Sequence, residues 1–371
     1  MQKHILNLFL GLLLSLNAVY AESDNKTCIE IDMSTPTRID FNDLVENISC
    51  TKLDGYYFDG CISLIPFKEY LYLMGETISG KNITIYNRKG EFIKNITFSD
   101  ALIVNSMCIV PTLDELWVIS RLKRISKFKL DGTLIKRVAL PFNCANAYAV
   151  NGDDFLLYSG GGATNIENHY LALTDFKSVH KLFMPQRNKT AFNHWSLYAP
   201  DVFNENLFMF FHLIDTIYSY NIKDQELRPH YKLNFHGDFL SESQVPSGKN
   251  EDSEMSEIIT KRKYIYAHYS FYQASGKLFF KLVGKRDDFC MINLEDNRLF
   301  SFDRLFDSFG SYQINPFVAS DGKRLYLLAK ERDLVEHYQN IKCTYPALRK
   351  LLPTLSPEGN AWILVTIDIK A

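Results

Sequence analysis

The sequence predicts an all-β fold: a six-bladed β-propeller of four-stranded antiparallel blades. A short apolar segment recurs six times, each copy is surrounded by further short strands and turns, and long amphipathic helices are missing from most of the chain. Four antiparallel strands in roughly every 40–50 residues, repeated four to eight times, are typical of a β-propeller. A large β-sandwich with irregular loops is the alternative for the same strand content.

The recurring apolar segment is the clearest element of each unit. Its copies are YLYLMG from Tyr70, ELWVIS from Glu115, DFLLYSG from Asp154, NLFMFFH from Asn206, KLFFKLV from Lys277 and RLYLLAK from Arg324. Another apolar segment precedes each copy, as CISLIPF does at 61–67, and in the first five units a second strand, a turn and a third strand follow. Each of these units therefore supplies four strands, and we expect residues 22–371 to form one domain.

Two neighbouring units repeat a hairpin closely. ITIYNRKGEFIKNI at 83–96 matches ISKFKLDGTLIKRV at 125–138, with Gly90 and Gly132 at the same position of the turn. Glycine supplies the positive φ that a tight hairpin needs. The charges of both copies are expected on the turn and on the solvated side of the outer strands.

The sixth unit is interrupted and short of one strand. RLYLLAK is followed by a stretch with apolar residues at helical spacing, which predicts a helical insertion over 331–354. AWILVTIDIK at 361–370 then returns to a strand pattern. The missing outer strand is available in TRIDFNDLVENISCTKLD at 37–54. We expect this N-terminal strand to complete the last blade and close the ring.

Residues 1–21 have the features of a secretory signal peptide. A short polar start with Lys3 precedes about a dozen apolar residues, and small residues stand at Val19 and Ala21. The apolar run is too short to cross a bilayer, and no later run is long enough. We expect cleavage near Ala21 and export to the periplasm or the cell exterior. No cysteine follows the apolar run directly, so a lipid anchor is not expected.

The seven cysteines are Cys28, Cys50, Cys61, Cys108, Cys144, Cys290 and Cys343. None forms a CxxC pair, so a structural zinc site is not supported. The favoured interpretation is small buried apolar residues. Export also allows oxidation, and Cys50 with Cys61 is then the expected disulfide by proximity in sequence.

The charge balance limits the classes of partner that the protein is expected to bind. The chain has 41 Lys and Arg against 43 Asp and Glu, a formal net charge of −2, which argues against nucleic-acid binding.

A polar stretch over 237–263 is expected to be a mobile surface loop, with a lid or a partner-contact segment as the alternative. Nothing in the sequence requires a cofactor, and we expect a monomer.

The stretch TRIDFNDLVENISCTKLDGYYFDGCISLI at 37–65, with the hairpin at 83–96, resembles six-bladed β-propeller proteins common in Bacteroidetes. Many of these are known only as domains of unknown function, and NHL-type propellers share the D-x-x-G turn. The resemblance covers the mature chain and implies export and a propeller, without an established reaction. TFSDALIVNS at 97–106 replaces a Gly-rich stretch that members often carry, and the lipid-acceptor cysteine that many members have is missing.

Candidate site residues are few. His194 and His268 open corresponding segments, NHWSLY and AHYSFY, and are the candidate metal ligands of the central channel. Hydrogen bonding within loops or strands is the alternative role for both. Trp195 and Tyr198 are candidates for lining the channel mouth, where aromatic faces suit sugars or peptides.

Three functions fit these observations. The favoured one is a non-catalytic exported propeller that binds a small molecule, glycan or protein at one face of its channel. The second is a hydrolase or lyase that acts on glycans or lactone-like substrates, although no catalytic motif is present and no catalytic residue can be named. The third is a structural partner of an outer-membrane uptake complex, which a large exposed apolar patch would favour.

Overall fold

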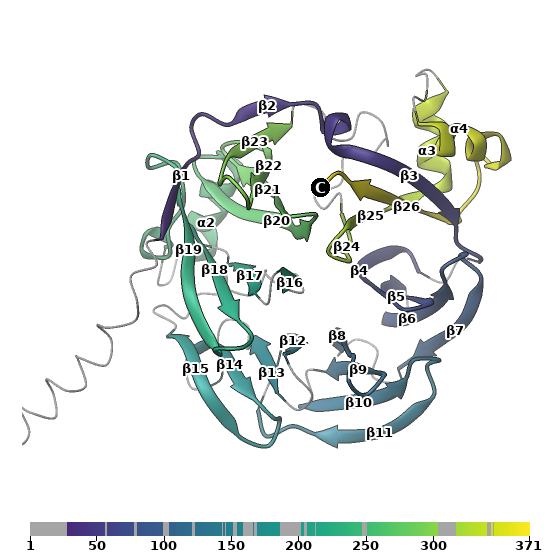
Figure 1. Ribbon diagram of the computed structural model, residues 1–371, viewed down its shortest axis with the longest axis horizontal. Helices are drawn as coiled ribbons and strands as arrows, with labels where there is room; N and C mark the ends of the chain where they lie inside the picture. The colour runs from purple at the N-terminus through teal and green to yellow at the C-terminus, as the bar shows by residue number, and fades with distance from the viewer. Residues whose placement is uncertain are drawn as a thin grey trace, which may run out of the picture.

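The structure is a computed structural model in which six sheets, four of four strands and two of five, surround a central axis (Figure 1). It describes residues 28–55, 58–77, 80–98, 104–120, 123–142, 144, 146–150, 154–158, 166, 169–185, 202–203, 206–211, 213–246, 251–302, 317–339, 343 and 345–371. The prediction of a six-bladed β-propeller is confirmed.

The first three blades follow the chain in order. Blade 1 contains β4 (Gly60–Phe67), β5 (Tyr70–Thr77), β6 (Gly80–Asn87) and β7 (Phe92–Thr97). Blade 2 contains β8 (Val104–Val110), β9 (Glu115–Ser120), β10 (Arg124–Lys129) and β11 (Leu134–Ala139). Blade 3 contains β12 (Asn146–Ala149), β13 (Phe155–Tyr158), β14 (His169–Thr174) and β15 (Val179–Pro185). Neighbouring strands within each blade are antiparallel.

The other three blades each include an N-terminal strand. Blade 4 has β16 (Val202–Phe203), β17 (Asn206–Phe210), β18 (Thr216–Asn221) and β19 (Glu226–Asn234), with β1 (Ile29–Asp32) beside β19. Blade 5 has β20 (Ile265–Ala274), β21 (Lys277–Gly284), β22 (Phe289–Asn293) and β23 (Leu299–Phe302), with β2 (Thr37–Ile39) beside β23. Blade 6 has β24 (Ala319–Ser320), β25 (Arg324–Lys330), β26 (Trp362–Ile369) and β3 (Val45–Lys52).

The N-terminal segment closes the ring as expected, and it also pairs with two other blades. β3 pairs antiparallel with β26, from Ile363↔Lys52 to Ile369↔Val45, and supplies the outer strand of blade 6. β1 and β2 add parallel fifth strands to blades 4 and 5, which was not predicted from the sequence. In Figure 1 this segment runs along the rim of the ring past three blades.

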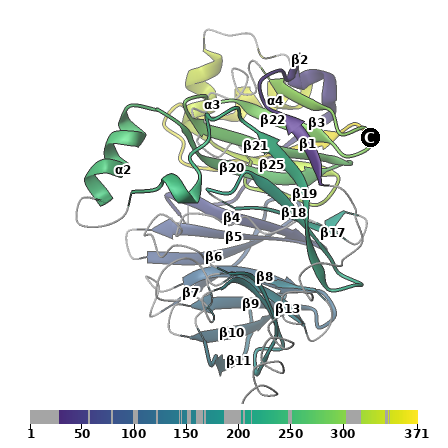
Figure 2. The same cartoon turned by 90° about the vertical axis from the view of Figure 1, so that its left-hand side faces the viewer.

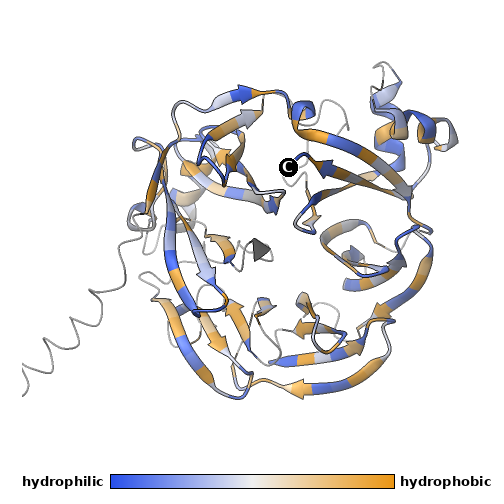
Figure 3. Ribbon diagram, viewed as in Figure 1, coloured by the Kyte–Doolittle hydropathy of each residue, from blue (hydrophilic) through white to orange (hydrophobic). Residues whose placement is uncertain are grey.

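The apolar core lies between the blades. Within the described residues, six buried clusters each join two neighbouring blades, for example Tyr72 and Ile85 of blade 1 with Leu116 and Phe128 of blade 2. Figure 3 shows apolar and polar stretches alternating around the ring. Burial of both faces of each sheet accounts for the high content of Phe and Tyr.

The structure differs from the expectation of a mobile loop over 237–263. This segment contains η5 (Glu242–Gln244) and α2 (Glu251–Thr260), and α2 projects from the side of the ring (Figure 2). Met255 is only 1% exposed and packs in a small cluster with Leu213 and Leu240. Ile258 and Ile259 also pack against this cluster, and so few apolar residues in a polar stretch did not predict the helix.

The insertion in blade 6 is helical. It contains α3 (Glu331–Tyr338), α4 (Pro346–Leu351) and η6 (Leu352–Thr354), between β25 and β26. Glu331 is 3% exposed, and its Oε1 accepts hydrogen bonds from Lys52 Nζ at 2.8 Å and from the Ser356 amide at 2.9 Å. The Lys52 bond attaches the insertion to β3, and the Ser356 bond ties the first residue of the insertion to its end.

No helix among the described residues is both long enough and apolar enough to span a membrane.

The two turn glycines predicted from the hairpin repeat are constrained differently. Gly90 has φ of 85° and Gly132 has φ of 80°. A Cβ at Gly90 would overlap the main-chain oxygen of Lys52, whereas one at Gly132 would lie 2.8 Å from the Ile85 Cδ1 atom. Each turn therefore packs against the preceding blade, but Gly90 faces main chain as well as the Thr51 side chain, whereas Gly132 faces side-chain atoms alone.

We predict that Gly90→Ala lowers the free energy of unfolding more than Gly132→Ala. Both variants suffer the positive-φ penalty of about 1–2 kcal/mol. Gly90→Ala must also displace main chain at the junction of blades 6 and 1. Urea unfolding of both variants measures the difference, and equal destabilisation would contradict the account.

We also predict that acid detaches β1. Hydrogen bonds from Ser34 and His236 lower the pKa of Asp32 from 3.8 to about 2. Because the folded-state pKa is lowered, the stabilisation is present above the ordinary value and is lost as the pH falls from about 4 to about 2. Pepsin cleavage within residues 29–39 should increase over this range, and the Asp32→Asn variant should lack that increase when the two are compared at each pH.

Candidate binding site between blades 1 and 2

Of the four residues predicted for the channel, the structure describes one, His268. His194, Trp195 and Tyr198 are outside the residues that the structure describes, so their roles stay predictions. His268 lies in β20, is 1% exposed and stacks parallel on Phe210, with ring centroids 3.7 Å apart. The structure thus gives His268 an aromatic packing role between blades 4 and 5. Across the described ranges there is no group of three or more His, Cys, Asp or Glu side chains suited to a metal ion.

The structure does not bring Cys50 and Cys61 together. Both thiols are free, and the two residues pack in different clusters, Cys50 between blades 5 and 6 and Cys61 between blades 6 and 1. Burial raises the pKa of each thiol to about 12. Both thiols are therefore protonated near neutral pH, in line with the favoured interpretation of these cysteines as small apolar residues.

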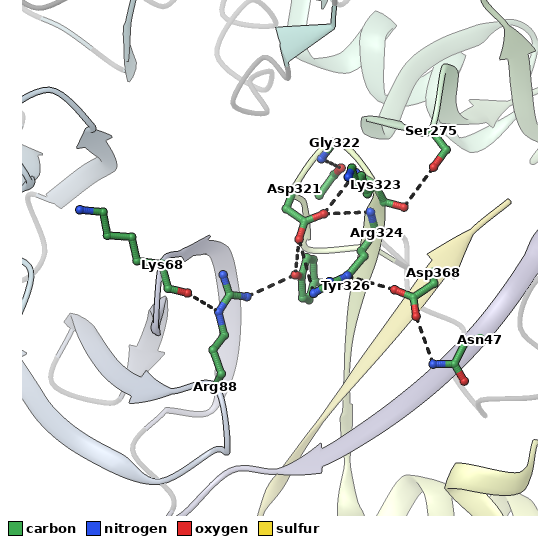
Figure 4. Close-up of polar contacts among 11 residues, drawn as sticks. Asn47, Lys68, Arg88, Ser275, Asp321, Gly322, Lys323, Arg324, Tyr326 and Asp368 are labelled. Atoms are coloured by element: carbon green, nitrogen blue, oxygen red, sulfur yellow. Dashed lines mark hydrogen bonds and ion pairs between the residues drawn. The ribbon is translucent and has the colours of Figure 1, made fainter. Parts of the chain in front are cut away.

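A polar cluster joins blade 1 to blade 6 where the ring closes (Figure 4). Tyr326 Oη donates to Asp321 Oδ2 at 2.7 Å and accepts from Arg88 Nη1 at 3.3 Å, and Arg88 Nε donates to the Lys68 carbonyl at 2.8 Å. Burial and the neighbouring Asp321 carboxylate raise the pKa of the Tyr326 phenol. The phenol therefore stays neutral and bridges the two blades.

The same cluster extends to the N-terminal strand. Arg324 Nε lies 3.0 Å from Asp368 Oδ1, and Asn47 Nδ2 donates to Asp368 Oδ2 at 3.1 Å (Figure 4). Its ionic groups are thus engaged with one another, which fits a role in holding the ring closed rather than in binding a ligand.

An open groove of about 500 Å³ lies between blades 1 and 2. It is formed by the β4–β5 turn and start of β5, the β8–β9 turn, the β10–β11 turn and one residue of β11. Its lining residues are Glu69, Tyr70, Leu113, Asp114, Glu115, Lys129, Leu130, Asp131 and Ile135. Strands alternate in direction along a blade, so these turns meet at the same end of the ring.

The groove carries excess negative charge. Lys68 Nζ contacts both oxygens of Asp114 at 2.6 Å, and Trp117 Nε1 donates to Glu115 Oε2 at 2.6 Å. Hydrogen bonds from Thr133 hold the pKa of Asp131 below its ordinary value. Four carboxylates thus stand against Lys68, Lys129 and Lys94, whose charge also acts on Asp131, so a small excess of negative charge remains that suits a cationic group.

Exposed apolar side chains lie in the groove and on the outer strands of blades 1 and 2. Among the described residues, the exposed large apolar side chains all belong to blades 1 and 2, and they are Phe92 (38%), Ile93 (39%), Leu113 (49%), Leu134 (46%) and Ile135 (42%). Leu113 and Ile135 also line the groove. Exposed apolar side chains in a polar groove and on neighbouring strands are typical of an interaction surface.

None of these groove residues was predicted from the sequence as a site residue. The signal that was available is positional: KEY at 68–70 and LDEL at 113–116 place acidic residues in the same turn of consecutive units. In sequence such residues look like ordinary solvated turns, and only the packing of neighbouring blades gathers them in one groove.

The comparisons with known proteins agree with this architecture. A family model described as a 6-bladed beta-propeller matches residues 59–327, which is more than half of the chain. The chain belongs to this family of six-bladed β-propellers. The expected resemblance to such propellers is therefore confirmed.

A solved structure supports the same propeller fold. A protein from Bacteroides fragilis NCTC 9343, described as exported, is similar with 17% identity and a TM-score of 0.74, over 93% of this chain and 100% of that chain. BamB from Moraxella catarrhalis has 11% identity and a TM-score of 0.36, over 69% of this chain and 66% of that chain, a similarity that carries no argument. No curated protein matches the chain.

Proposed function

We propose that this propeller is an exported, non-catalytic recognition module that binds a protein partner on blades 1 and 2. The groove receives a cationic side chain of the partner, and the exposed apolar side chains contact the residues beside it. The signal-like N-terminus and the similarity to a protein described as exported support export.

The observation that carries the proposal is the coincidence of two features on one surface. The groove has more carboxylates than cations, and two of the exposed large apolar side chains, Leu113 and Ile135, line it. Protein interfaces combine an apolar centre with polar groups that fix register and select partners. A small ligand alone would not require the apolar residues of the outer strands.

Peptide titration tests the proposal. The probes are three short peptides of equal length in which leucine alternates with lysine, with serine or with glutamate, and calorimetry at low and physiological salt measures their affinity. The lysine peptide should bind at least about tenfold more tightly than the serine peptide, and salt should weaken its binding.

The double variant Asp114→Asn with Glu115→Gln should bind the lysine peptide about tenfold more weakly than the wild type does. Asp224→Asn, an exposed acidic residue in the β18–β19 turn of blade 4 and outside the groove, is the control and should bind as the wild type does. Equal affinity for the three probes, or a groove variant that binds normally, would contradict the proposed function.

A further inference from the structure

The chain itself shows that a blade of this ring accepts an added strand. β1 pairs in parallel with β19, from Ile29↔Tyr231 to Asp32↔Asn234. β2 pairs in parallel with β23, from Thr37↔Phe300 to Ile39↔Phe302. A fifth strand on the outer edge is therefore compatible with the twist of these blades and with packing between neighbours.

β1 shows which chemistry such a strand can have. Its sequence IEID alternates apolar and acidic residues. Ile31 is 5% exposed and packs in the cluster that contains Tyr231. Glu30 Oε1 accepts a hydrogen bond from Asn234 Nδ2 at 2.7 Å, and Asp32 Oδ1 lies 2.9 Å from His236 Nε2. Apolar side chains thus face the blades, while carboxylates meet polar groups of the receiving strand and the residues after it.

Blades 1 and 2 present outer edges that no described strand covers. Their sheet orders end at β7 and β11. Each of these strands begins with an exposed apolar pair, Phe92 with Ile93 and Leu134 with Ile135. Figure 3 shows apolar stretches along these outer strands. An open edge with exposed apolar side chains is a template for strand pairing.

The charges on β11 restrict what can pair there. Lys136 and Arg137 are exposed and follow the apolar pair, and β11 contains no acidic residue. Charged side chains and a bulge opposite Phe128 protect the edge against indiscriminate pairing. The same cations attract an acidic strand, so they select for one class of partner and against others.

We propose that the outer edge of β11 binds an extended segment of a partner protein, with alternating apolar and acidic residues, as a fifth strand of blade 2. Main-chain hydrogen bonds supply the affinity. Because neighbouring residues of a strand face opposite sides of the sheet, the apolar side chains meet Leu134 or Ile135 on one side and the carboxylates meet Lys136 or Arg137 on the other. This edge prefers the charge opposite to the one that the groove prefers, so the two proposals can fail separately.

Fluorescence anisotropy tests the inference with a labelled peptide in which isoleucine and valine alternate with glutamate. The wild type should bind it, and the double variant Lys136→Glu with Arg137→Glu should weaken binding at least about tenfold. Lys223→Glu, an exposed turn residue of blade 4, is the matched control and should change nothing. A lysine version of the peptide should bind the double variant better than the wild type.

A second probe separates strand addition from simple adhesion. Methylation of alternate peptide nitrogens removes main-chain donors without changing the side chains, so it should abolish binding to the wild-type protein. Hydrogen exchange should show new protection within 134–139 when the unmethylated peptide is bound. Undiminished binding of the methylated peptide, or loss of protection in 29–32 without protection in 134–139, would overturn the proposal.

Discussion

Deletion of β3, Val45–Lys52, should leave the chain without a cooperative native state. β3 is the partner of β26 along its whole length, and it also contacts α4 and holds Glu331 through Lys52. Its loss exposes an edge of β26 and the apolar cluster between blades 5 and 6, which Ile48 helps to bury. A net stability of about 5–15 kcal/mol does not withstand the loss of a whole strand where β3 pairs with β26 and closes the ring.

Circular dichroism and thermal scanning of the mature chain measure this effect. The matched control is a chain that begins at Ser34, which lacks β1 but keeps β2 and β3. The control should unfold cooperatively, because β1 is an addition to a blade that is already four-stranded. A cooperative transition in the β3 deletion near that of the control would contradict closure by the N-terminal strand.

Trp362→Ala should lower the free energy of unfolding by about 3–5 kcal/mol, the usual cost of truncating a large buried aromatic side chain. Trp362 begins β26 and is 5% exposed. Its ring stacks on Phe58 with centroids 5.3 Å apart, and its Nε1 donates to the Phe58 carbonyl at 3.1 Å. The side chain thus joins the last strand of the ring to the segment that leads into blade 1.

Trp362→Phe separates the two contributions. It keeps an aromatic side chain but leaves the buried Phe58 carbonyl without this donor, at a cost of about 1–3 kcal/mol. Chemical unfolding of both variants should give a clearly smaller loss for Trp362→Phe. A loss below about 1 kcal/mol for Trp362→Ala would show that the junction of blades 6 and 1 does not depend on this contact.

The ring could be predicted from sequence because its strands repeat. The hairpins around Gly90 and Gly132 share apolar spacing and turn chemistry, and the two glycines indeed have positive φ. β3 could be predicted because the count of strands left one place empty. β1 and β2 could not be predicted, because strands of four and three residues show little pattern. A blade that already has four strands also gives no reason to expect a fifth.

The candidate site was beyond sequence reasoning for a different reason. Glu69, Asp114 and Asp131 lie in three separate turns, and only the angle between blades 1 and 2 brings those turns together. Similarly, the alternation along β11 does not reveal that Leu134 and Ile135 are both exposed, because the bulge between β10 and β11 shifts the register. The sequence analysis instead directed attention to the channel, through His194 and His268.

Hydrogen exchange of the unliganded mature protein, followed by peptide mass spectrometry, tests the central claim most directly. The claim is that the N-terminal segment covers the outer strands of blades 4 and 5 and leaves those of blades 1 and 2 open. The account predicts slow exchange in 226–234 and 299–302 and faster exchange in 92–97 and 134–139. Equal rates in the four segments, or faster exchange in blades 4 and 5, would contradict it.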